Sequence, residues 1–257
     1  MSKYFFLFVM CLFNSLLFAE LNEEQLWAIA LTGIMSERNR SNFNTLEVSV
    51  MNERNKDTWL ETLRRDWDVK SREELLETIQ RMENSGHAAT LKYIQGIVQE
   101  TIQKNGDFSV FTMYNQYQLN SRQYNYLKFT VLNWNIFSNR SILAWDWGRM
   151  ISLCRWGYQV GFLAEMEAWE IIMYFAVKIQ EAYNSWEEYG FDYYMGRVFW
   201  ASGSGDDVSY ILETNPIYNR LIQEPGHWHG LKWNIDLPAR GRQPPFSNLQ
   251  KTPFPGP

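Results

Sequence analysis

The stretch SILAWDWGRMISLCRWG, residues 141–157, is the feature of this chain that most constrains its fold. Arranged as a helix, it is apolar on most sides, and helices of that kind lie in the interior of a protein. It nevertheless carries Asp146 and Arg149, two charges that cost free energy when they are buried without partners. The sequence therefore predicts a central, buried helix that Gly157 ends.

Amphipathic helices are expected on both sides of this stretch. Apolar residues recur at the spacing of one helical face in the segments 27–34, 59–67, 75–82, 91–102, 127–134, 164–183 and 186–200. Residues 107–119 fit a short strand or an irregular linker, and residues 201–207 fit a turn. We expect a mainly α fold, a single compact multi-helix domain over residues 20–237 with little or no sheet. A signal helix precedes it, and a flexible, Pro-rich tail follows over residues 238–257.

Two capping boxes mark the starts of helices. Ser71 and Glu74 lie three residues apart, as do Ser185 and Glu188, and such pairs can satisfy the exposed amides of a first helical turn. Gly86 is expected to end the first of these two helices in the left-handed conformation. The sequence thus predicts helix boundaries at these positions.

The N-terminus reads as an export signal. Lys3 precedes an apolar run over residues 4–18, and Ala19 is a small residue suited to cleavage before a polar segment. We expect residues 1–19 to be a signal peptide and the protein to be exported to the periplasm or cell envelope. The alternative is an uncleaved anchor in the inner membrane formed by residues 4–18. Cleavage leaves Cys154 as a single, buried thiol.

The charge and composition of the chain limit the classes of molecule that it is expected to bind. The formal net charge is −5 and no basic stripe occurs, so nucleic acid is not an expected partner. The membrane is expected to matter only through an uncleaved N-terminus. The chain holds 12 Trp, 14 Tyr and 16 Phe, and their helical spacing favours a core packed with aromatic rings. The alternative is an aromatic-lined groove for sugars, lipids or peptides.

Four charged residues are candidates for one partly buried cluster. Arg149 follows Asp146 at i+3, within reach of an ion pair. Glu167 lies in the next predicted helix, and Arg197 shares a helical face with aromatic residues. We expect all four to converge as a structural lock. The alternative is a pocket in which Asp146 or Glu167 has a shifted pKa and moves protons.

Histidines give little support for a metal site. His227 and His229 would share a face of an extended segment, but no third ligand accompanies them. We expect no metal and no cofactor. Trp228 and Trp233 are expected to dock this segment on the helical core, and His87 to stabilise the helix end at Gly86.

Several motifs carry a family resemblance. They are Ala144-Trp145-Asp146 with Arg149, Arg155 with Gly157-Tyr158, Glu167-Ala168-Trp169, Ser185-Trp186-Glu187-Glu188, and Gly196-Arg197 with Phe199-Trp200. Over roughly residues 22–233 the chain resembles the bacterial family catalogued as domain of unknown function 1266. The resemblance implies a family but no activity, because no activity is established for that family.

Three functions therefore stay open. The preferred hypothesis is a non-catalytic, exported module that binds another protein, such as an envelope or immunity-type factor. The second is an envelope hydrolase that uses Asp146 or Glu167 as its acid or base. The third is a structural component of an assembly.

Overall fold

The computed structural model describes residues 21–106, 109–226 and 228–237. These residues form helices and no strand, which confirms the mainly α prediction. The expected signal helix of residues 1–19 and the tail of residues 238–257 lie outside the described ranges. Among the described helices, none has both the length and the apolar character needed to span a bilayer.

The helices are α1 (Glu23–Ala30), α2 (Gly33–Asn39), α3 (Glu53–Trp67), α4 (Arg72–Ser85), α5 (His87–Asn105), α6 (Val110–Gln116), α7 (Ser121–Leu132), α8 (Trp134–Phe137), α9 (Leu143–Val160), α10 (Glu165–Ala182), α11 (Trp186–Ser202) and α12 (Asp207–Gln223).

Helix α9 is the centre of the molecule, as its apolar sequence predicts. Almost every one of its residues is buried, and α10, α11, α3, α4 and α5 all contact it. The helix does not stop at Gly157. It continues to Val160 and ends at Gly161 in the left-handed conformation, with φ 83°. Gly157 is instead a packing position, because a Cβ there would lie 2.3 Å from Leu75 Cδ2 of α4.

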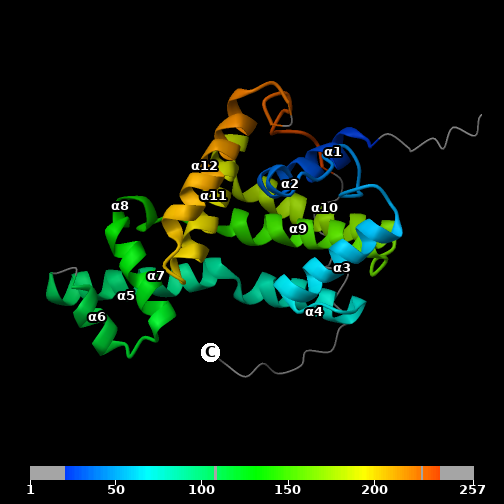
Figure 1. Ribbon diagram of the computed structural model, residues 1–257. Coiled ribbons are helices and arrows are strands. Elements are labelled where there is room, and N and C mark those ends of the chain that lie inside the picture. The colour runs from blue at the N-terminus through cyan, green and yellow to red at the C-terminus, as the bar shows by residue number, and fades with distance from the viewer. Residues whose placement is uncertain (1–20, 107–108, 227, 238–257) are drawn as a thin grey trace, which may run out of the picture.

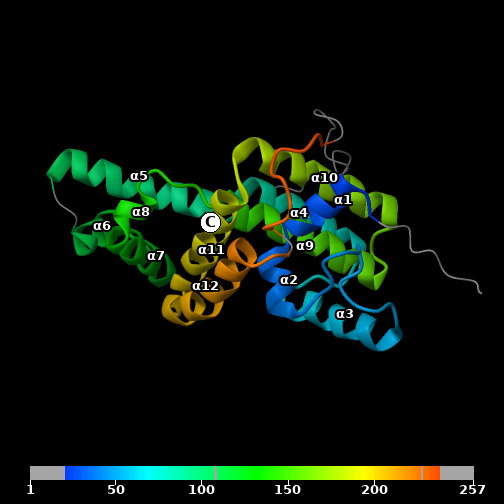
Figure 2. The same ribbon diagram turned by 90° about the horizontal axis from the view of Figure 1, so that it is seen from above.

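Two views show how the other helices lie relative to α9 (Figures 1 and 2). Helices α4 and α5 follow one another along one side of α9, while α11 and α12 lie side by side and cross it (Figure 1). Helices α6, α7 and α8 gather at the far end of α5 (Figures 1 and 2). In the view of Figure 2, α2 lies between α12 and α3.

Three further local predictions are wrong. Residues 107–119, expected to be a strand or linker, contain α6, whose first turn is capped by Ser109. Gly86 has φ −70° and ψ −174°, which is extended and not left-handed backbone, and it caps α5 at its start. His87 is accordingly the first residue of α5 and does not stabilise the end of α4.

Trp228 and Trp233 dock the chain segment after α12 on the core, as expected. Trp228 Nε1 donates to the Ala30 carbonyl at 2.7 Å, and Trp233 Nε1 donates to the Tyr183 carbonyl at 3.0 Å. Both rings pack against Trp186. These are core contacts, so part of the aromatic content serves packing.

Arg155 holds the loop between α2 and α3. Its guanidinium is buried without a carboxylate and donates to the carbonyls of residues 42, 45, 46 and 47 and to the hydroxyls of Thr32 and Ser36. Burial lowers its pKa to about 9, against the opposing effect of Glu47, and it stays protonated at neutral pH. Arg155 is therefore a structural anchor with all its donors used. Cys154, beside it, is buried, and burial raises the pKa of its thiol.

Candidate functional site

Asp146 links the central helix to the start of another helix. Its Oδ2 accepts a hydrogen bond from the Ala88 amide at 2.8 Å, and its Oδ1 accepts one from Arg149 Nη2 at 2.7 Å. The N-cap residue of α5, Gly86, has no side chain to satisfy the first amides of that helix. A carboxylate at a helix N-terminus satisfies such an amide and interacts favourably with the helix dipole. Asp146 of α9 therefore caps α5.

His87 completes the surroundings of this carboxylate. Its Nδ1 lies 3.1 Å from Arg149 Nη2 and 3.6 Å from Asp146 Oδ1. Nδ1 thus lies beside the Arg149 guanidinium, which only donates, and beside the Asp146 carboxylate, which accepts. Burial and the nearby Arg149 lower the pKa of His87 although Asp146 opposes them. The imidazole is therefore uncharged at neutral pH.

The ionisation state of Asp146 fits a structural ion pair and not a general acid. Burial alone would raise the pKa of this carboxyl, but His87, Arg149 and the Ala88 amide outweigh burial, and its pKa lies below the ordinary value. Both side chains of the Asp146–Arg149 pair are at most 8% exposed. A general acid that works near neutral pH needs a raised pKa. This carboxylate is instead held ionised.

Gly86 is required by the close approach of Asp146. A Cβ at position 86 would lie 2.3 Å from Asp146 Oδ2 and 2.8 Å from the Met82 carbonyl oxygen. Backbone conformation does not demand a glycine here, because φ is −70°. The absence of a side chain is what lets the carboxylate reach the amide of α5.

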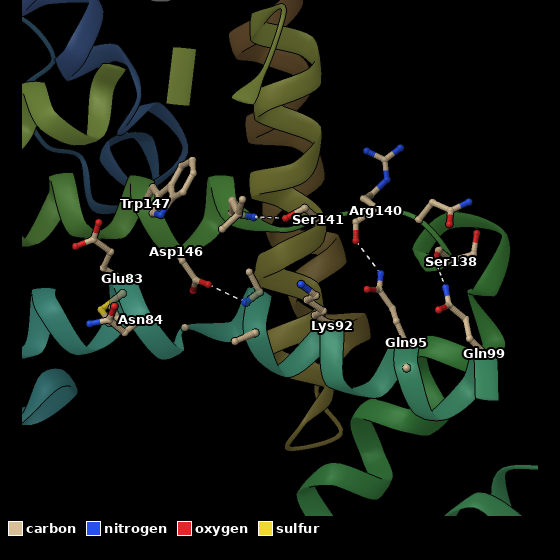
Figure 3. Close-up of a pocket in the computed structure, with 17 residues that line it drawn as sticks. Glu83, Asn84, Lys92, Gln95, Gln99, Ser138, Arg140, Ser141, Asp146 and Trp147 are labelled. Atoms are coloured by element: carbon tan, nitrogen blue, oxygen red, sulfur yellow. Dashed lines mark hydrogen bonds between the residues drawn. The ribbon is translucent and has the colours of Figure 1, made fainter. Parts of the chain in front are cut away.

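A groove of about 720 Å³ opens beside Asp146, between α4, α5 and the segment that precedes α9. Figure 3 shows Asp146 reaching across to the start of α5, and Lys92, Gln95 and Gln99 spaced along that helix. Gln95 donates to the Arg140 carbonyl at 2.8 Å. The second carboxylate of the groove, Glu83, accepts hydrogen bonds from Tyr174 and Lys178, each at 2.6 Å. Both carboxylates of the groove are thus engaged.

The expected four-membered cluster does not form. Asp146 and Arg149 pair as predicted, but Glu167 pairs with Arg72 of α4. Arg197 pairs with Glu213 of α12 at 2.7 Å. The prediction was wrong because sequence spacing indicates which charges share a helix, but not which neighbouring helix faces them. Glu167 is a partly exposed carboxylate in an ion pair with Arg72, and this arrangement gives no support to a role as an acid or base.

The two capping boxes are present with one shift. The hydroxyls of Ser71 and Ser185 accept from the amides of Glu74 and Glu188, both at 3.2 Å. Each glutamate reaches one residue further back than the usual box. Glu74 accepts from the Lys70 amide at 2.6 Å, and Glu188 from the amide of residue 184 at 2.9 Å. These four residues therefore serve helix starts.

Asp192 is a buried charge that was not predicted from the sequence. This residue of α11 is buried, forms an ion pair with Arg140 and lies near the Tyr183 hydroxyl. Burial raises its pKa to about 6, against the opposing effects of Arg140 and Tyr183. In the sequence, Asp192 is flanked by Phe191 and Tyr193 in the helix that follows Ser185. These aromatic neighbours could have indicated that the carboxylate is buried.

A second cavity, of about 620 Å³, lies between α2, α3, α9, α11 and α12. Its walls combine aromatic rings with guanidinium groups, and we call it the Trp–Arg cavity. Its defining residues are Trp59, Trp67, Trp145, Trp156, Trp200, Tyr210, Arg38, Arg65, Arg149 and Arg197. Asp66 is the carboxylate that lines it, and Asp66 pairs with Arg65 at 2.7 Å. Their helical spacing had favoured a place for these tryptophans in the core. The sequence feature that could have indicated a cavity is Arg149, a charged residue four positions after Trp145 in a helix rich in tryptophan.

Charge is not balanced in the Trp–Arg cavity. Glu213 is shared, because its Oε1 pairs with Arg38 Nε and its Oε2 with Arg197 Nη2, each at 2.7 Å. Arg197 is 2% exposed and lies over the ring of Tyr210 at 4.8 Å. Burial and the neighbouring Arg38 lower the pKa of Arg197, against the opposing effect of Glu213. One carboxylate thus serves two guanidinium groups.

Two buried donors of this cavity have no partner. Arg197 Nε and Trp145 Nε1 are both buried and form no hydrogen bond. A buried donor without an acceptor is costly, and natural proteins leave few of them. The Trp145 ring also lies under the Arg149 guanidinium, at 4.2 Å. Both side chains line the cavity, and their two N–H groups find no acceptor among the described residues.

Metal binding finds no support in the described part of the chain. No group of three His, Cys, Asp or Glu residues there could hold a metal ion. His229 is exposed and its Nδ1 contacts the Ile222 carbonyl at 3.2 Å. His227, the other candidate, lies outside the described residues.

The described residues form a helical domain. At its centre the carboxylate of Asp146 caps α5 and pairs with Arg149, and the Trp–Arg cavity is lined in part by the same Arg149. The family model described as "Protein of unknown function (DUF1266)" matches residues 62–233, and the chain belongs to this family.

Among curated proteins, the chain is similar to two from Escherichia coli (strain K12). It is 28% identical over 154 residues to the uncharacterized protein YbeR, an alignment that covers 57% of this chain and 60% of YbeR. It is 25% identical over 152 residues to the uncharacterized protein YbeU, covering 59% and 62% respectively. The match therefore spans about three fifths of each relative. No solved structure matches significantly.

Proposed function

We propose that this protein is a non-catalytic binding module, exported to the cell envelope, that recognises a protein partner through the Trp–Arg cavity. One observation carries the proposal: the cavity combines aromatic walls with unpartnered N–H donors, and its lining carboxylate, Asp66, is paired. Such a surface supplies binding groups. It offers no free base or nucleophile among its lining residues.

The alternative of a hydrolase has less support. Its two candidate residues, Asp146 and Glu167, are each engaged in an ion pair. Asp146 in addition has a lowered pKa and caps α5. A role as a structural part of an assembly is supported by no separate feature and would leave the unpartnered donors of the Trp–Arg cavity unexplained.

Affinity capture tests the proposed function. The bait is the full chain, as wild type, as Arg197→Gln and as Arg64→Gln, and the source is an envelope extract from the same cells. Arg64 is the matched control, because it is an exposed arginine of α3 paired with Glu61 outside the cavity. A partner that wild type and Arg64→Gln retain, that Arg197→Gln loses, and whose mass is unchanged after incubation supports the proposal. Equal capture by Arg197→Gln, or a partner returned in cleaved form, contradicts it.

A further inference from the structure

We propose that the Trp–Arg cavity binds a carboxylate attached to an aromatic ring, with the carboxylate held by Arg197 and Trp145 and the ring packed against the tryptophan side chains that line the cavity. This inference rests on the proposed function, since it names the chemical group that the binding module recognises. Hydrogen-bond donors, net charge and wall shape lead to it separately.

The donors require an acceptor. Arg197 Nε and Trp145 Nε1 are buried, unpartnered and donor-only, and both side chains line the cavity. Hydrogen bonds from a guanidinium to a carboxylate are shorter and stronger than neutral ones. A carboxylate that displaces the atoms covering these two N–H groups would satisfy both donors, whereas an apolar ligand would leave them without partners.

The charge balance favours a monoanion. The four arginines of the cavity, Arg38, Arg65, Arg149 and Arg197, share three carboxylates as ion-pair partners, Asp66, Asp146 and Glu213. Four positive groups and three negative groups leave one positive charge. That charge belongs to the Arg38–Glu213–Arg197 group, because the other two pairs are each neutral. A carboxylate balances it, whereas a phosphate monoester brings about −1.5 to −2 at neutral pH.

The walls favour a flat ring. Trp59 and Trp156 stack at 5.4 Å between ring centroids, and Trp67 meets Trp156 edge-on at 6.2 Å. Trp200, another lining residue, lies 5.9 Å from Trp145 between ring centroids. Aromatic groups gain affinity from stacked and edge-on contacts of this kind. The volume of about 620 Å³ also lies within the usual range for sites of small ligands.

Two sources present this chemistry. One is the C-terminal residue of a protein partner when that residue is aromatic, and the other is a free aromatic acid. N-acetylphenylalanine is a probe for the shared group, and a short peptide with a C-terminal phenylalanine is a probe for the protein source. If the peptide binds more tightly than N-acetylphenylalanine, the natural ligand is the C-terminus of a protein. If the two bind equally, the natural ligand is a free aromatic acid.

Isothermal titration calorimetry on the full chain tests the inference. N-acetylphenylalanine is compared with N-acetylphenylalanine amide, which lacks the charge, with N-acetylalanine, which lacks the ring, and with adenosine monophosphate, which carries a phosphate. We expect N-acetylphenylalanine to bind at least about tenfold more tightly than each of the other three. Equal binding of the amide, or tighter binding of the phosphate, overturns the inference.

Variants locate the binding. Arg197→Gln and Trp145→Phe are each expected to weaken N-acetylphenylalanine about tenfold or more, because each removes one donor. Glu213 keeps Arg38 as its partner in Arg197→Gln, which protects the fold. Trp169→Phe is the matched control, since Trp169 Nε1 is also buried and unpartnered but lies outside the cavity. Loss of binding in Trp169→Phe as large as in Trp145→Phe overturns the inference.

The two proposals fail separately. A partner captured through Arg197 that shows no binding of N-acetylphenylalanine overturns the ligand chemistry and leaves the proposed function standing. Binding of N-acetylphenylalanine without any partner that depends on Arg197 overturns the protein-binding function and assigns the cavity to a free acid.

Discussion

Asp146 Oδ2 on α9 accepts a hydrogen bond from the Ala88 amide at the start of α5, 2.8 Å away. The same carboxylate neutralises Arg149 through its other oxygen. One buried side chain therefore satisfies a helix start and a guanidinium together. This relationship explains why the central, buried helix carries an aspartate.

Replacing Asp146 by Ala should destabilise the fold strongly. The change leaves Arg149 buried without its carboxylate and the Ala88 amide without an acceptor, and breaking a buried pair in this way costs about 3–5 kcal/mol. Chemical denaturation measures the loss. Asp66→Ala is the control, because the exposed Arg65–Asp66 pair should contribute less than about 1 kcal/mol. An unchanged unfolding midpoint for Asp146→Ala would refute the lock.

Two glycine substitutions should have opposite signs. Gly86→Ala places a Cβ 2.3 Å from Asp146 Oδ2, so we expect a loss of stability of about 1–3 kcal/mol. Gly96→Ala in the exposed part of α5 meets no atom within 4 Å, and its better helix propensity should add up to about 1 kcal/mol. Thermal unfolding of both variants checks this. Equal effects at both positions would show that Asp146 does not need the space at residue 86.

Acid should weaken the fold through His87. Asp146 and Arg149 of α9 and Arg122 of α7 are the charged groups that act on it, and its pKa in the folded protein is lowered. The unfolded chain therefore binds this proton more readily, so stability falls as pH drops below about 6.5, the ordinary value for histidine. His87→Asn should lose less stability over that window. Denaturation curves from pH 7 to pH 5 measure the slope, and an identical slope in both proteins would contradict the assignment.

Asp192 should act in the opposite direction. Its folded pKa of about 6 lies above the ordinary value of 3.8, so the folded protein holds the proton more strongly. Stability from this group falls as pH rises from about 4 to 6, by roughly 3 kcal/mol at most. Relative to wild type, Asp192→Asn should gain stability across that interval. A difference between the two proteins that does not change with pH would exclude a raised pKa.

The sequence predicts the central helix and its internal ion pair, because both depend on residues close in the chain. The buried character of α9 and the i, i+3 pairing of Asp146 with Arg149 are local properties. The partners supplied by other helices are not local. Ala88, which receives the Asp146 cap, and Glu213, which pairs with Arg197, lie 58 and 16 residues away from them.

Helix α12 was not predicted, and the Trp–Arg cavity follows from that omission. Pro216 lies inside α12 on its exposed side, where proline weakens the sequence signal for a helix. Without α12 neither Glu213 nor Tyr210 could be placed beside Arg197. Spacing also assigned the tryptophans of α3 and α9 to a helical face but could not indicate whether that face meets another helix or a cavity.

The indole N–H resonance of Trp145 gives the most direct test of the Trp–Arg cavity. Nuclear magnetic resonance resolves indole N–H groups, and Trp145→Phe identifies this one by its disappearance. We predict that N-acetylphenylalanine moves the resonance in a saturable way as the N–H donates to the carboxylate, and that N-acetylphenylalanine amide leaves it in place. A Trp145 resonance that stays unmoved by the acid, or that moves equally with the amide, would contradict carboxylate recognition in this cavity.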